Sequence, residues 1–345
     1  MTTTSTAAPA EIAARPGGPV LSVRGLSVEY RGGLDPVRAC TDVTVDLQRG
    51  EILGVVGESG SGKSTLISAL TRLERPPAVI SSGQVLYSPA GGGPAIDLVS
   101  LGGVALRRLR WTSLSIVLQS AMDALNPVMR LGAQFADVLR THDRSLSNTD
   151  AWQEARRLLG MVGIAADRVG AYPHELSGGM RQRATIALAL ACRPELVVMD
   201  EPTTAVDVVM QRQILAQVLA LREELGFAVV FVTHDLSLLL EIADRIAVMY
   251  AGRVVELASA RDLYRHPRHP YTQGLRDSFP PLKAPLTRLE GIPGSPPDLR
   301  ALPVGCAFAD RCPAVMDVCR RQRPELRHRG TAEVACHLHD EERAR

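Results

Sequence analysis

Lysine is almost absent from this chain of 345 residues, in which Lys63 and Lys283 are the only two among 39 basic side chains. Aromatic residues make up only 4%, and the net charge is only +2. Such an even charge balance argues against a nucleic-acid-binding protein, whose affinity comes mainly from neutralising phosphates. No apolar run reaches the roughly 18 residues of a membrane-spanning helix, and residues 1–19 lack the apolar stretch of a secretory signal. We therefore expect a soluble cytoplasmic protein with no nucleic-acid partner.

Apolar residues are plentiful, at 46%, and the length suffices for a large core and about two domains. Two segments alternate apolar and polar residues as strands do, at 21–30 and 43–47. Three short apolar runs each lead into polar residues and then a helix-like stretch, at 51–56, 196–199 and 228–232. Strands that alternate with helices predict an α/β fold with a parallel sheet covered on both faces.

The composition of the chain divides it into three parts. Residues 1–19 are rich in Thr, Ala, Pro and Gly, so we expect a disordered tail. After residue 258 the chain becomes proline-rich over 266–303, and four of its six cysteines follow. We therefore expect a main domain over residues 20–258 and a small appended domain over 259–345.

A glycine-rich loop follows the first apolar run. Its sequence, Gly-Glu-Ser-Gly-Ser-Gly-Lys-Ser-Thr over residues 57–65, matches the G-x-x-x-x-G-K-[ST] phosphate-binding motif between a strand and a helix. Glycines let successive backbone N–H groups face the phosphates, and the helix N-terminus adds its positive end. Lys63 is expected to bridge the β- and γ-phosphates, and Ser64 to ligate Mg²⁺. A glycine turn without a ligand is the alternative, and the strand–loop–helix context disfavours it. The expected nucleotide-binding residues are Gly57, Ser59, Gly60, Ser61, Gly62, Lys63, Ser64 and Thr65.

A second motif indicates the class of nucleotide-binding protein. The stretch Leu-Ser-Gly-Gly-Met-Arg-Gln over residues 176–182 resembles the signature motif of ABC-transporter ATPases, and the resemblance extends over about residues 20–258. It implies a P-loop NTPase cassette with a RecA-like core, a helical subdomain and an antiparallel β-subdomain. In that family two cassettes close head to tail, so Ser177, Gly178, Gly179 and Gln182 would contact ATP bound to the partner's loop.

The same resemblance assigns the catalytic groups. Asp200 and Glu201 end an apolar run as in the Walker B motif, where Asp200 would hold Mg²⁺ and Glu201 would polarise the attacking water. A general base in that place contributes about 10²–10⁴ in rate. His234 resembles the switch histidine that contacts the γ-phosphate and the water. Glu201, His234 and Lys63 are the expected catalytic residues.

Three further positions match family motifs. Gln119 matches the Q-loop glutamine, a contact of Mg²⁺ and water, and Asp207 matches the D-loop. Tyr30 lies where the family stacks an aromatic ring on adenine. Taken singly, such residues are more often satisfied polar groups or strand aromatics, so their order and spacing carry the argument. Ser120 and Ala121 depart from the pattern of peptide-importer relatives, which usually carry an acidic residue and proline there.

Two more stretches narrow the transporter class. The string His-Pro-Arg-His-Pro-Tyr-Thr over 266–272 resembles an element of oligopeptide, dipeptide and nickel importer ATPases, as does the stretch 124–129. On physical grounds alone, the string predicts only restricted backbone and a helix that begins near Tyr271 and packs on the main domain. The resemblance implies an ATPase at the cytoplasmic face of the membrane that drives peptide uptake. Its partners would be a second ATPase subunit in another polypeptide, two transmembrane permeases and an extracytoplasmic peptide-binding protein. The alternatives are a nickel or other small-solute importer and, from another class, a soluble ABC ATPase of repair or translation.

The last part of the chain holds four cysteines within 31 residues: Cys306, Cys312, Cys319 and Cys336. A reducing cytosol argues against disulfides, and thiolates suit zinc or an iron–sulfur cluster. Structural zinc usually has closer pairs of cysteines than these. The set resembles that of dipeptide and oligopeptide importer ATPases, which implies a [4Fe–4S] cluster, with zinc and unmetallated thiols as alternatives. We expect His337 and His339 to be exposed tail residues, and Cys40 and Cys192 to be small core residues.

Overall fold

The computed structural model describes residues 18–119, 124–203, 206–278 and 291–343. The predicted disordered tail lies outside these residues except at its end. There, the first strand begins at Pro19, one residue before the boundary expected at residue 20. Ser120 and Ala121, which depart from the family pattern, also lie outside the described residues.

An eight-stranded sheet runs through the centre of the molecule, in the order β11-β12-β10-β9-β3-β8-β7-β6. Five neighbouring strands are parallel to one another: β3 (Ile52–Val56), β6 (Leu114–Val117), β7 (Leu196–Asp200), β8 (Ala228–Val232) and β9 (Arg245–Tyr250). Three antiparallel strands complete one edge: β10 (Arg253–Ser259), β11 (Arg327–Arg329) and β12 (Ala332–Val334). The predicted parallel sheet is confirmed, and the three apolar runs form its strands β3, β7 and β8.

Both faces of this sheet are buried, which explains the uninterrupted apolar runs. Successive strand residues point to opposite faces, so Leu53 and Val55 enter one core whereas Ile52 and Val56 enter the other. The first core also contains α1 (Lys63–Leu70) and the smaller antiparallel sheet β2-β1-β4-β5. The strands of that sheet are β1 (Pro19–Tyr30), β2 (Val37–Gln48), β4 (Ala78–Tyr87) and β5 (Ile96–Asp97). The second core lies under the helices.

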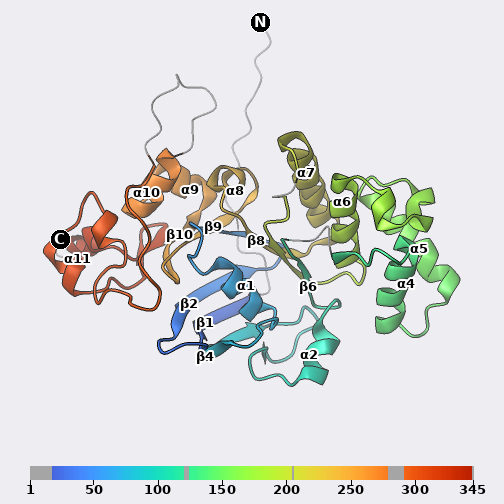
Figure 1. The fold of residues 1–345 in the computed structure, drawn as a ribbon, viewed down its shortest axis with the longest axis horizontal. Coiled ribbons are helices and arrows are strands. Elements are labelled where there is room, and N and C mark those ends of the chain that lie inside the picture. The colour runs from blue at the N-terminus through green and yellow to red at the C-terminus, as the bar shows by residue number, and fades with distance from the viewer. Residues whose placement is uncertain (1–17, 120–123, 204–205, 279–290, 344–345) are drawn as a thin grey trace, which may run out of the picture.

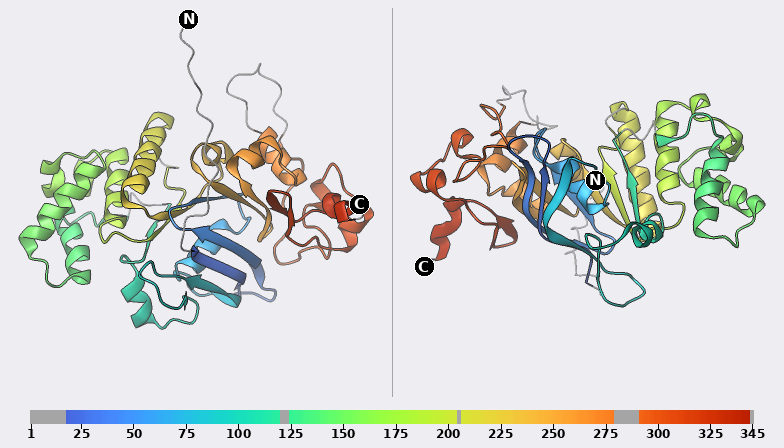
Figure 2. Two further views of the ribbon diagram at one scale, coloured as in Figure 1. Left: turned by 180° about the vertical axis from the view of Figure 1, so that it is seen from behind. Right: turned by 60° about the horizontal axis from the view of Figure 1, so that its bottom comes forward.

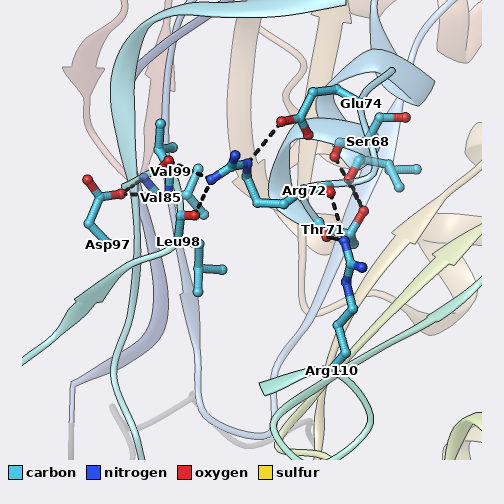
Figure 3. Close-up of polar contacts among 10 residues, drawn as sticks. Ser68, Thr71, Arg72, Glu74, Val85, Asp97, Leu98, Val99 and Arg110 are labelled. Atoms are coloured by element: carbon cyan, nitrogen blue, oxygen red, sulfur yellow. Dashed lines mark hydrogen bonds and ion pairs between the residues drawn. The ribbon is translucent and has the colours of Figure 1, made fainter. Parts of the chain in front are cut away.

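Arginine side chains tie the C-terminal end of α1 to the smaller sheet (Figure 3). The Arg72 guanidinium donates to the carbonyl oxygens of Leu98 and Val99 and, at 2.9 Å, to the Glu74 carboxylate. Arg110, which follows α2 (Gly103–Leu109), donates to the Arg72 carbonyl oxygen at 2.8 Å. These contacts hold the C-terminal end of α1 against the segment that follows β5 and against the end of α2.

Three of the helices form a group at one end of the long axis, opposite the C-terminal segment (Figures 1 and 2). This group comprises α4 (Leu131–His142), α5 (Asn148–Met161) and α6 (Gly178–Ala189), with short 3-10 turns at Ala166–Gly170 and Pro173–Glu175. Between it and the centre lies α7 (Val208–Leu225), and α8 (Leu236–Ile242) covers the sheet near β3. Within the described ranges, no helix is both long and apolar enough to cross a membrane.

The C-terminal segment is built onto the main sheet. Its elements are α9 (Ala260–Arg265), α10 (Pro270–Asp277), α11 (Asp317–Arg321), 3-10 turns at Ala309–Arg311 and His337–Arg343, and the hairpin β11–β12. The hairpin extends the sheet because β12 pairs with β10. Tyr271 and Phe308 pack their rings on Tyr250 of β9, with centroids 4.6 and 5.3 Å away. The residues expected to form a small appended domain thus share both sheet and core with the rest, since so few apolar residues could not form a core alone.

Candidate functional site

The carboxyl ends of four adjacent parallel strands meet at one edge of the central sheet. The glycine-rich loop follows β3, and Gln119, Glu201 and His234 follow β6, β7 and β8. Open α/β sheets bind ligands at this edge, because the loops after the strands meet there. The structure thus brings four of the expected motifs together from distant parts of the sequence.

The glycine-rich loop wraps around the ammonium group of Lys63. Its Nζ donates to the carbonyl oxygens of Gly57 and Glu58, at 2.7 and 2.8 Å. Gly62, at the start of α1, has a φ of 100°, and a Cβ there would lie 2.1 Å from the Ala39 carbonyl oxygen. Only glycine fits that position. Burial lowers the pKa of Lys63, and the nearby carboxylates, that of Glu201 first, oppose the shift.

Glu201 lies at the centre of a small polar network. Gln119 Nε2 donates to one carboxylate oxygen, and His234 Nδ1 lies against the other, each at 3.0 Å. The Glu201 side chain is only 14% exposed, whereas that of His234 is 62% exposed. Glu201 has a φ of 44°, a strained conformation that costs about 1–3 kcal/mol and that is concentrated at functional sites. A carboxylate held at both oxygens has a fixed orientation.

Asp200, the last residue of β7, is buried beside Glu201. Burial raises the pKa of Asp200 to about 6, the Glu201 charge adds to the shift, and Lys63 opposes it. Within the described part of the chain, its buried Oδ1 has no hydrogen-bond partner. An unpaired buried carboxylate oxygen is costly unless a cation or a water compensates it.

Two other expected residues, Tyr30 and Ser64, lie at the same loop, and a third, Asp207, lies at the start of α7. Tyr30, at the end of β1, shares a hydrogen bond of 3.0 Å between its hydroxyl and that of Thr65. Ser64 is exposed at the first turn of α1. Asp207 caps α7, with Oδ1 accepting from the Met210 N–H at 2.9 Å.

The residues of the signature-like motif lie elsewhere. Ser177 caps α6, with its Oγ accepting from the Met180 N–H at 3.3 Å. Figure 1 shows α6 in the helical group, with α7 between it and the centre of the molecule. Gly179 is tightly packed, since a Cβ there would lie 2.6 Å from the Met210 sulfur. Gln182 is buried, and its Nε2 has no hydrogen-bond partner among the described residues. Within one chain, the signature-like motif therefore lies apart from the glycine-rich loop.

The four C-terminal cysteines gather around one small cavity: Cys306, Cys312, Cys319 and Cys336 all line it. Burial raises the pKa of Cys306 and Cys312, and that of Cys336 to about 12. In the described residues, however, no group of three or more His, Cys, Asp or Glu side chains is placed to hold a metal ion. The structure thus confirms that these cysteines lie together and does not support the iron–sulfur or zinc ligand.

The expectation of exposed histidines near this cavity is wrong for His337. Its side chain is buried, and both ring nitrogens are engaged, by Asp340 at 2.7 Å and by the Gln322 carbonyl oxygen at 2.9 Å. His339 Nε2 lies 3.1 Å from the Arg268 carbonyl oxygen. Of the other two cysteines, Cys40 is buried in β2 as expected, whereas Cys192 lies in the turn after α6 and is only partly buried.

One set of contacts was not predicted. Arg311, directly before Cys312, pairs with Glu58 of the glycine-rich loop, and the Tyr271 hydroxyl accepts the Glu58 backbone N–H at 2.9 Å. Tyr271 belongs to the His-Pro-Tyr-Thr string, so this string marks a contact to the loop as well as a helix start. No local pattern links Arg311 to Glu58, because they are 253 residues apart.

The chain matches two family models. The first, described as ABC transporter, matches residues 40–204, and the second, described as oligopeptide/dipeptide transporter, C-terminal region, matches residues 255–319. An ATP-binding protein of Brucella melitensis, named for peptide import, is 44% identical, with 89% of this chain and 93% of the relative covered. The dipeptide transport ATP-binding protein DppD of Haemophilus influenzae is 39% identical, with 92% and 95% covered.

A solved structure supports the fold. The ATP-binding cassette MJ0796, in a dimeric post-hydrolysis state bound to ADP and Pi, is 27% identical and superposes with a TM-score of 0.61 over 70% of this chain and 99% of that one. The predicted P-loop cassette fold is confirmed, whereas a separate cysteine-rich domain is not shown. By these matches, the chain belongs to the family of oligopeptide/dipeptide ABC transporter ATP-binding subunits.

Proposed function

We propose that this chain is the ATP-hydrolysing subunit of a peptide importer and works at the cytoplasmic face of the membrane. The observation that carries the proposal is the convergence of the glycine-rich loop, Gln119, Glu201 and His234 at adjacent strand ends. A bound polyphosphate there meets backbone N–H groups, one ammonium group and one oriented carboxylate. Phosphoryl transfer needs mainly such positioning and charge stabilisation.

ATP binding depends on the loop residues 57–65 and on Tyr30. The loop N–H groups and Lys63 would hold the phosphates, with Lys63 exchanging its carbonyl contacts for phosphate oxygens. Tyr30 would stack on adenine, and its bond to Thr65 already holds the ring beside the loop.

Hydrolysis depends on Glu201. Its carboxylate would accept a proton from the attacking water, while His234 contacts the γ-phosphate and the same water. The bonds from Gln119 and His234 hold the two oxygens of Glu201 in place and so orient the base.

The residues also fit a magnesium ion. Asp200 offers a buried oxygen that lacks a hydrogen-bond partner within the described ranges, and Gln119 keeps Oε1 available because its Nε2 donates to Glu201. Ser64, Gln119 and Asp200 would hold the ion, which when bound neutralises charge on the phosphates.

The signature-like residues Ser177, Gly178, Gly179 and Gln182, with Asp207, would act across a cassette dimer. Their separation from the loop of the same chain supports a composite site formed with a second subunit. We propose that this subunit is a different polypeptide, and that two permeases and an extracytoplasmic peptide-binding protein complete the transporter. Residues 20–258 would form the cassette, and residues 259–345 its peptide-importer extension.

We also propose that the four cysteines hold a [4Fe–4S] cluster. Their shared cavity and their soft thiol donors support this proposal. The cluster would cross-link a segment that has little core of its own.

The test is reconstitution of the purified subunit with its permeases in vesicles. We expect slow ATP hydrolysis by the isolated chain and strong stimulation when the permeases and a peptide-loaded binding protein are present. Nickel in place of peptide is the matched control. Full activity of the isolated chain, or stimulation by nickel alone, would contradict the peptide-importer function.

A further inference from the structure

The second residue of the glycine-rich loop is held from the far end of the chain. Arg311 Nη1 and Nη2 donate to the two carboxylate oxygens of Glu58, at 2.8 and 3.0 Å. The Arg311 side chain is only 6% exposed and that of Glu58 is 26% exposed, so solvent screens this pair less than it screens a surface pair. A bidentate pair of this kind fixes orientation as well as charge.

Arg311 is itself locked in place. Its Nε donates to the Pro293 carbonyl oxygen at 2.8 Å, Nη2 donates to that of Ile292 at 3.3 Å, and Nη1 donates to the Tyr250 hydroxyl at 3.2 Å. With the two bonds to Glu58, all five N–H donors of the guanidinium are used. An arginine with all five N–H donors engaged has a fixed orientation, unlike one in an exposed surface ion pair.

The backbone of Glu58 is held as well. Its N–H donates to the buried Tyr271 hydroxyl at 2.9 Å, and its carbonyl oxygen accepts from Lys63 at 2.8 Å. Two of the partners of Glu58, Arg311 and Tyr271, therefore come from the C-terminal extension. The others are Lys63 and the Ser61 N–H, which donates to the same carbonyl oxygen at 3.2 Å.

The Glu58–Arg311 pair also affects the charge that a bound phosphate would meet at the loop. An unpaired carboxylate one residue after Gly57 would repel the polyphosphate that the loop binds. Pairing with Arg311 neutralises Glu58 and keeps its side chain directed away from Lys63, which would otherwise be a competing cation for it.

We propose that Arg311 and Tyr271 are positioning residues of the ATP site, so that the C-terminal extension completes the glycine-rich loop. This inference rests on the proposed ATPase function. It predicts that loss of the pair weakens ATP binding through Glu58 while leaving turnover at saturating ATP largely intact.

The test measures binding of a fluorescent ATP analogue with Mg²⁺ to the full chain, and the KM and kcat of the assembled transporter. Arg311→Met should raise Kd and KM about tenfold, the effect of losing a buried charge-assisted pair. Adding Glu58→Gln to Arg311→Met should recover most of that loss, because the repelling carboxylate is gone. The matched control is Arg320→Met in the same segment, whose pair with Asp310 is exposed, and it should bind like the parent.

Two further variants test the loop contact and the ATP site separately from Arg311. Tyr271→Phe removes only the acceptor of the Glu58 N–H and should raise Kd about threefold, which tests the loop if Arg311→Met does not fold. Lys63→Ala separates the two proposals, because unchanged binding in that variant would overturn the ATP site itself. If Lys63→Ala weakens binding while Arg311→Met and Tyr271→Phe do not, the positioning role alone fails. Weak binding by Arg311→Met that Glu58→Gln does not relieve would mean a purely structural arginine and would also overturn it.

Discussion

The glycine-rich loop and the four-cysteine segment are assembled in opposite ways. In the loop, Lys63 is bonded to residues at most six positions away, and the close approach of Gly62 to β2 excludes any side chain there. Three of the cysteines lie in irregular segments and Cys319 lies in α11. They meet where Arg311, Phe308 and the β11–β12 hairpin pack on the main sheet. The lysine contacts of the loop are therefore local, and only Glu58 is held by the extension, whereas the cysteine site depends on packing throughout.

Replacement of the catalytic carboxylate should give the largest effect and test the first half of that comparison. Glu201→Gln keeps the shape of the side chain but removes its basic oxygen, so turnover should fall about 10²- to 10⁴-fold. ATP binding should persist and trap a closed, ATP-loaded dimer, which size-exclusion chromatography detects. Glu241→Gln, an exposed glutamate on α8, is the control. Turnover near that of the parent would show that Glu201 is not the base.

Removal of the loop ammonium should act on binding. Lys63→Ala leaves the phosphates without their cation, and loss of charged hydrogen bonds should weaken ATP binding about 10- to 100-fold. Calorimetric titration with Mg²⁺-ATP measures the change, and circular dichroism checks that the fold persists. Equal affinity in variant and parent would refute the assignment of Lys63.

Below about pH 6, acid should weaken Mg²⁺ binding about tenfold for each pH unit. Because the pKa of Asp200 is raised to about 6, the carboxyl is protonated below that pH and cannot hold Mg²⁺. Since the folded pKa lies above the usual value near 4, protonation favours the folded state at low pH, and this stabilisation is lost as pH rises through about 6. Mg²⁺ titrations between pH 5 and 8 test this, with Asp200→Asn as the control for protonation of ATP itself. The same pH slope in that variant would assign the titration to another group.

Disruption of the cysteine segment should have the smallest effect on the nucleotide site. Protein purified without oxygen should be brown, with absorbance near 400 nm and about four iron atoms per chain. Cys312→Ser should lose that colour and open residues 300–340 to protease, and should weaken ATP binding only a few-fold, through the neighbouring Arg311. Cys192→Ser, outside the segment, is the control. Colourless protein with stoichiometric zinc would overturn the cluster but not the four-cysteine site.

The sequence predicted what periodicity and local motifs determine. The strands around β3, β7 and β8, the helix that begins at Lys63 and the strand-end placement of Gln119, Glu201 and His234 all follow from the order of short apolar runs. It did not predict the Arg311–Glu58 pair or the engagement of both His337 nitrogens, because those partners are brought together only by tertiary packing. The sequence also did not predict that the extension adds strands to the main sheet. Strands of three residues are too short to show an alternation of apolar and polar residues.

The short hairpin has a consequence for how the chain is made. Val334 of β12 pairs with Glu256 of β10. During synthesis, this edge of β10 therefore stays unpaired until 78 further residues have been added to the chain. At typical rates of synthesis this takes several seconds, during which unpaired N–H and C=O groups of β10 are open to other strands. A chain that stops early would keep that edge open permanently. A fragment that ends near residue 258 would lack β12 and would therefore expose this edge of β10 to pairing with other strands.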